Sequence, residues 1–115
     1  MRTRSTLGAA MRVGALATAL AVAGGPAAAQ DAKAGRAKAQ ACMVCHGQNG
    51  LSTQPDAPNL AGQPTYYLVA QLKAYQSGER RHEVMSMMAK TLSEEDVANV
   101  AAWFASIKVE AHVPR

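Results

Sequence analysis

The chain is short of the features that build membrane spans, β-sheets and disulfide frameworks. It holds two cysteines, one Trp, three Tyr and one Phe among 115 residues. A transmembrane helix needs about 20 predominantly apolar residues, and the apolar run over residues 13–23 is too short for one. After residue 30, no alternation of apolar and polar residues typical of strands appears. These absences favour one small all-α domain.

The N-terminal segment has the pattern of a secretory signal peptide. Residues 1–12 contain three arginines and no acidic residue, residues 13–23 are small and apolar, and residues 24–29 read Gly-Gly-Pro-Ala-Ala-Ala. A basic start, a short apolar core and small residues at the cleavage site define such signals. We therefore expect residues 1–29 to be removed on export to the periplasm, leaving residues 30–115 as one domain without stable membrane insertion.

Removal of that segment changes the charge balance. Twelve Lys and Arg oppose eight Asp and Glu in the full sequence, a net charge of +4. Without the three arginines of the signal, nine basic residues remain and the net charge is +1. A nearly neutral domain gives no indication of a nucleic-acid partner or of an anionic membrane surface as partner.

Three main helices are predicted after the signal, over residues 32–44, 64–77 and 93–108. Pro64 suits the first turn of a helix and Gly78 suits a C-terminal stop. Ser93 is a favourable N-cap, followed by three acidic residues at the positive end of the helix dipole. Gly35 lies inside the first helix, where glycine is mildly costly, which predicts close packing against another element.

The two connections, residues 47–62 and 79–92, are expected to be loops. The first is rich in Gly, Asn, Ser, Gln and Pro, and the second holds Met85, Met87 and Met88. Loops of this length are uncommon in so small a domain unless they have a functional role. They indicate that the chain wraps around a large cofactor.

The run Cys42-Met43-Val44-Cys45-His46 is a haem-attachment signature. Two thiols at this spacing can add to the two vinyl groups of one porphyrin. The adjoining imidazole of His46 then lies where it can bind the iron. The motif predicts one covalently bound haem c.

The two cysteines also have two other interpretations. A Cys42–Cys45 disulfide would suit a thioredoxin-like redox protein, but the strand-helix-strand pattern of that fold is missing. A zinc site needs two further ligands at typical spacing, and His82 and His112 do not sit in such a motif. The methionines supply candidates for a sixth iron ligand, because a thioether favours ferrous iron. Each methionine is equally suited to packing in the core.

Taken together, residues 32–107 resemble a class I bacterial cytochrome c. The resemblance is to the small single-haem cytochromes and to one half of the tandem two-haem respiratory cytochromes. Only one attachment motif is present, so this copy holds one haem. The resemblance rests on Gly35, the Cys42–Gly47 run, Pro58-Asn59-Leu60-Ala61-Gly62-Gln63, Tyr67, Gln71, Leu92-Ser93 and Ala102-Trp103-Phe104.

The resemblance implies a role for several residues. It implies that the first helix crosses closely against the last at Gly35, with Trp103 or Phe104 packing into the gap. In the family, a proline carbonyl at the position of Pro58 accepts a hydrogen bond from the ligand imidazole. The axial methionine lies seven residues before the Leu of the Leu-Ser pair, which is Met85, with Met88 as second choice. Contacts with the haem propionates are implied for Tyr67, Gln71 and Arg80 or Arg81, although both arginines also suit a solvated surface. His82 is expected to be exposed.

The implied function is electron transfer rather than catalysis. We expect a soluble periplasmic carrier of single electrons between respiratory or dehydrogenase redox partners. The alternative is a cytochrome subunit of a periplasmic dehydrogenase complex for sulfur compounds or alcohols, docked through residues 109–115. A haem enzyme or gas sensor is a third possibility and would need an open or weakly held sixth position on the iron.

Overall fold

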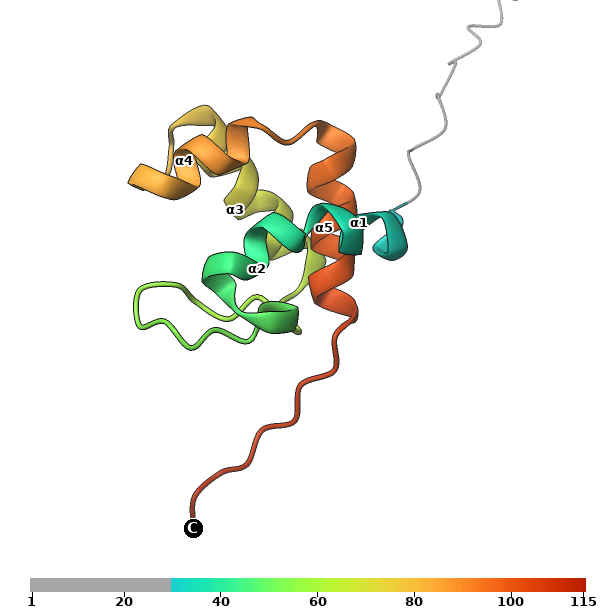
Figure 1. Ribbon diagram of the computed structural model, residues 1–115, viewed down its shortest axis with the longest axis vertical. Helices are drawn as coiled ribbons and strands as arrows, with labels where there is room; N and C mark the ends of the chain where they lie inside the picture. Colours follow the sequence, from blue (N-terminus) through green and yellow to red (C-terminus); the bar gives the residue numbers. More distant parts are fainter. Residues whose placement is uncertain (1–29) are drawn as a thin grey trace, which may run out of the picture.

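The computed structural model describes residues 30–115, so the signal peptide expected over residues 1–29 lies outside the described residues. Within the described part all regular structure is helical, and no helix there is long and apolar enough to cross a membrane. The all-α prediction is confirmed, but with five α-helices in place of three. The elements are α1 (Ala32–Lys38), α2 (Gln40–His46), the short 3-10 helix η1 (Gln48–Gly50), α3 (Thr65–Ser77), α4 (Glu83–Lys90) and α5 (Glu94–Ser106) (Figure 1).

The first expected helix is divided into α1 and α2 at Ala39. This residue keeps right-handed angles, φ −66° and ψ −10°, and its N–H donates to the backbone oxygens of Gly35 and Ala37. Ala39 is completely buried in the core. Alanine is a strong helix former, so helix propensity does not predict a break at this residue. The break follows from how the two segments pack.

The prediction that residues 79–92 form a loop is wrong over its second half, where α4 lies. The helix begins after His82, which is not among the residues usually found at an N-cap. The charges at its ends do suit a helix dipole, with Glu83 in the first turn and Lys90 in the last. This eight-residue helix carries Met85, Met87 and Met88 and so determines where their side chains lie.

The other two expected helices are confirmed with small changes at their ends. Pro64 has ψ 137° and stands just before α3 instead of inside its first turn, whereas Gly78 ends α3 with φ 81°. Ser93 caps α5 in a reciprocal capping box with Asp96, in which each side chain accepts from the other's backbone N–H at 3.0 Å. The last helix ends at Ser106, two residues earlier than expected.

Helix α5 is the centre of the fold, with α1 crossing it and α3 packed along it (Figure 1). At the crossing, a Cβ on Gly35 would lie 1.9 Å from the backbone oxygen of Asn99 and 3.1 Å from Cβ of Trp103. The expected role of Gly35 in close packing is therefore confirmed, with Trp103 at the crossing. Phe104 points elsewhere, because its ring packs against Gly50.

The core is built on the inner face of α5. Two ion pairs lie at the N-terminal end of this helix. Lys38 of α1 pairs with Asp96 at 3.0 Å, and Lys73 of α3 pairs with Glu94 at 2.6 Å. Both pairs are open to solvent and contribute little stability, so the burial of apolar side chains dominates the packing of α5. The buried apolar residues of α5 are Val97, Val100, Ala101 and Phe104.

Candidate haem site

One pocket brings together side chains from α2, α3, α4, α5 and the segment 51–64. Its walls are largely apolar, with Leu68, Leu72, Val100 and Phe104 among the residues that form them. Such walls suit the flat, apolar body of a porphyrin. Every site residue expected from the sequence, apart from the second choices, lines this pocket: Cys42, Cys45, His46, Pro58, Tyr67, Gln71, Arg80 and Met85.

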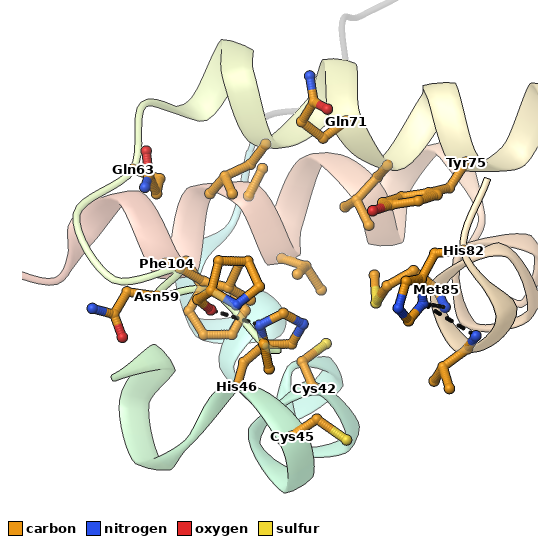
Figure 2. Close-up of a pocket in the computed structure, with 18 of the residues that line it drawn as sticks. Cys42, Cys45, His46, Asn59, Gln63, Gln71, Tyr75, His82, Met85 and Phe104 are labelled. Atoms are coloured by element: carbon orange, nitrogen blue, oxygen red, sulfur yellow. Dashed lines mark hydrogen bonds between the residues drawn. The ribbon is translucent and has the colours of Figure 1, made fainter. Parts of the chain in front are cut away.

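The thiols come from successive turns of α2. Residues three apart in a helix lie on the same face, so Cys42 and Cys45 both reach the pocket (Figure 2). Both thiols are free, Cys42 half-buried and Cys45 exposed. Burial raises the pKa of the Cys42 thiol, an effect that a backbone hydrogen bond partly opposes. The inner thiol is therefore held in its neutral form, and the outer one is open to solvent.

His46 ends α2 and turns its ring into the pocket. The side chain is buried, with 7% of its surface exposed, and Nδ1 lies 2.8 Å from the backbone oxygen of Pro58. Because a carbonyl only accepts, Nδ1 carries the proton and donates it in this bond. Nε2 is then left with a free lone pair, which is the form in which imidazole binds a metal.

The loop after η1 is closed in a way that delivers the Pro58 carbonyl. The backbone oxygen of Gly50 accepts from the N–H groups of Leu60 and Ala61, at 2.8 and 3.1 Å. The side chain of Asn59 accepts from the N–H of Ser52 at 2.7 Å. These bonds fold residues 51–61 back toward α2, so the hydrogen bond that the resemblance implied for Pro58 is present.

Met85 lines the pocket from α4, away from the thiols. Figure 2 shows Met85 beside His82 on one side, with Cys42, Cys45 and His46 on the other. The other two methionines are outside the pocket lining, and Met87 is 63% exposed. Met88 lies one turn after Met85 on α4 and is not part of the pocket lining.

The side chains of Arg80 and Arg81 lie in different places. Arg80 lines the pocket, donates to Oε1 of Gln71 at 2.5 Å and stacks over the ring of Tyr75 at 4.7 Å. Arg81 instead donates to the backbone oxygen of Gly78 at 3.3 Å and lies outside this pocket. The pocket therefore has one fixed guanidinium at its edge.

His82 is exposed, as expected, but it also caps α4, a role that the sequence did not indicate. Its Nδ1 accepts from the N–H groups of Val84 and Met85, both at 3.2 Å. The ring also lines the pocket. A histidine at an N-cap has no distinctive sequence signal, because the usual caps are Ser, Thr, Asp and Asn.

The donor set of the pocket fits haem c. Two thiols at the attachment spacing, an imidazole with a free Nε2, a thioether on another wall and an apolar interior are the groups that this cofactor needs. Among residues 30–115 no three His, Cys, Asp or Glu side chains come together as a metal site. The described residues thus offer a haem pocket and no protein-only zinc site.

Comparisons with known proteins agree with this geometry. The sequence model of the family Cytochrome c matches residues 32–108. Cytochrome c-554(548) of Halomonas halodenitrificans is 43% identical over 81 residues, which cover 68% of this chain and 98% of that protein.

Two solved structures resemble the fold. The reduced recombinant cytochrome c4 from Pseudomonas stutzeri has a TM-score of 0.66 and 38% identity, over 70% of this chain and 47% of that one. The thiosulfate dehydrogenase TsdBA from Marichromatium purpuratum has a TM-score of 0.65 and 37% identity, over 68% of this chain and 19% of that one. The chain thus spans nearly all of one relative and less than half of the others.

Proposed function

Because the chain belongs to the cytochrome c family, we propose that it shuttles single electrons between redox proteins of the periplasm. Family membership makes it an electron-transfer protein with covalently attached haem c. The periplasmic location rests on the signal pattern of residues 1–29. The free, single-haem state rests on the one attachment motif and on the match to nearly the whole of cytochrome c-554(548).

The observation that carries the proposal is the position of His46 and Met85 in the lining of one pocket with both thiols. In the proposed site, Cys42 and Cys45 would hold the porphyrin through thioether bonds, and His46 and Met85 would ligate its iron. When bound, haem supplies the one-electron couple. Ligation by His and Met raises its reduction potential relative to ligation by harder donors.

The protein contributes orientation, burial and charge to this site. The carbonyl of Pro58 keeps the proton on Nδ1 of His46, which fixes the ring and raises its basicity toward a metal. The guanidinium of Arg80, held between Gln71 and Tyr75, provides a positive charge at the pocket edge for the haem propionates. Tyr67, which is 42% exposed and lines the same pocket, supplies a phenol there.

A redox titration of the mature protein tests the proposal. We expect a c-type difference spectrum that follows one single-electron step, one haem per chain by mass spectrometry, and loss of residues 1–29. Carbon monoxide should leave the Soret band of the reduced protein nearly unchanged at first, because Met85 would already ligate the iron. Prompt carbon monoxide binding would instead favour the haem enzyme or gas sensor.

A dehydrogenase subunit is the second candidate, favoured by the similarity to part of a thiosulfate dehydrogenase. The C-terminal segment after α5 carries exposed apolar side chains, with Val109 53% and Val113 85% exposed, and it extends away from the helices (Figure 1). Purification from the native cell separates the two candidates. A free shuttle elutes alone, whereas a subunit elutes with a stoichiometric enzyme partner.

A further inference from the structure

The helix that carries Met85 is capped by an imidazole from within the pocket wall. The N–H groups of Val84 and Met85 in the first turn of α4 would otherwise lack a partner. Both donate to Nδ1 of His82 at 3.2 Å (Figure 2). In return, the N–H of His82 donates to Oγ of Ser86 at 3.1 Å. The arrangement is a reciprocal box in which the ring of histidine takes the place of the usual hydroxyl or carboxylate.

The far end of α4 is held separately. Nε2 of Gln76, on α3, donates to the backbone oxygens of Ala89 and Leu92 at 2.9 and 3.0 Å. A helix of eight residues is marginal by itself, so its place depends on such terminal contacts together with the burial of Ala89 in the core. Gln76 fixes the last turn against α3, which leaves the first turn, the one that carries Met85, dependent on His82.

We propose that His82 is the positioning residue for Met85: by capping the first turn of α4 at the edge of the pocket, it would keep the thioether in place to ligate the iron. The inference rests on the proposed assignment of Met85 as the axial ligand. The same ring bonds the backbone N–H of Met85 and lines the pocket that its side chain enters. Fraying of the first turn would therefore move the ligand itself, and not a distant part of the helix.

The test compares three variants of the mature holoprotein: His82→Ala, His82→Asn and His112→Ala. The measurements are the near-infrared sulfur-to-iron band of the oxidised protein and the rate of carbon monoxide binding to the reduced one. His82→Ala should weaken the band and raise the rate about fivefold, the population change expected for loss of one helix cap. His82→Asn should restore both properties, because its side-chain oxygen accepts from the same amides. His112, in the exposed C-terminal segment, serves as the matched control and should change neither.

Two results would overturn the proposal. One is a His82→Ala protein with lower thermal stability but an unchanged band and an unchanged carbon monoxide rate, which would make the imidazole a structural cap only. The other is a His82→Asn protein as impaired as His82→Ala. If His82→Ala does not mature, Ser86→Ala, which removes only the return bond, must raise the carbon monoxide rate or the proposal fails.

Failure of the ligand assignment gives a different signature. In that case the near-infrared band would be missing from the parent protein or would survive in Met85→Ala. If the parent band depends on Met85 but not on His82, the ligand assignment stands and only the positioning role is lost.

Discussion

Gly35 and Asn99 meet where α1 crosses α5, so closely that a Cβ on Gly35 would lie 1.9 Å from the backbone oxygen of Asn99. The side chain of Asn99 is buried at the same crossing, and its Oδ1 accepts from the N–H of Asp31 at 2.8 Å. The start of α1 is thus tied to α5 by one hydrogen bond and one close backbone contact. Since α5 forms a wall of the pocket, this crossing supports the site.

Replacement of Gly35 should therefore destabilise the folded protein. We expect Gly35→Ala to lower the free energy of unfolding by about 3 kcal/mol, since the backbone of α5 must move to admit the methyl group. Urea unfolding of the holoprotein measures this. Gly78→Ala is the matched control: its Cβ would meet nothing within 4 Å, and only the left-handed φ of 81° opposes it, at about 1 kcal/mol. Equal losses in the two variants would show that α1 and α5 are not in close contact.

The pKa of Asp96 predicts how stability varies in acid. The Ser93 N–H and the Lys38 ammonium both stabilise the carboxylate and lower its pKa below the usual value. A group with a lowered folded-state pKa contributes stability that is present above its unfolded pKa and is lost as the pH falls through the folded one. The parent protein should therefore lose stability over the acid range in which Asp96 takes up its proton.

Asp96→Asn isolates the charge, because an amide oxygen can still accept from Ser93. Thermal melts should show the variant to be less stable than the parent at neutral pH, with the gap closing as the pH falls below the folded pKa. Glu95→Gln, an exposed carboxylate in the same turn, should show a much smaller gap. A difference between Asp96→Asn and parent that stays constant with pH would contradict the assigned role of the carboxylate.

Arg80 should affect the reduction potential of the haem more than Arg81 does. A positive charge near the haem favours the reduced state, so Arg80→Ala is expected to lower the reduction potential. Arg81→Ala should lower it less, since that guanidinium bonds Gly78 outside the pocket. Potentiometric titration of both variants at one salt concentration provides the comparison. Equal shifts would mean that Arg80 acts through overall charge alone.

Much of the fold could be predicted because the local signals agreed with it. Ser93 and the acidic residues after it mark the start of α5, and Gly78 marks the end of α3. The Cys42–His46 run identified the cofactor, because its spacing alone carries that meaning. The class I resemblance and the all-α fold are confirmed by the family match and by the cytochrome c4 structure.

The remainder depended on tertiary contacts. Helix α4 was missed because its cap is an imidazole and because its last turn is fixed by Gln76, thirteen residues before Ala89. Without that helix, the residues themselves left the methionines open, and Met85 was preferred over Met88 only through the family resemblance. The choice between Arg80 and Arg81 was open for the same reason, since it depends on how the chain leaves α3.

The central claim is that His46 and Met85 ligate one haem held by Cys42 and Cys45, and the near-infrared spectrum of the oxidised protein tests it most directly. We expect the sulfur-to-iron band to be present in the parent, absent in Met85→Ala and retained in Met88→Ala. A band that survives in Met85→Ala and disappears in Met88→Ala would contradict it.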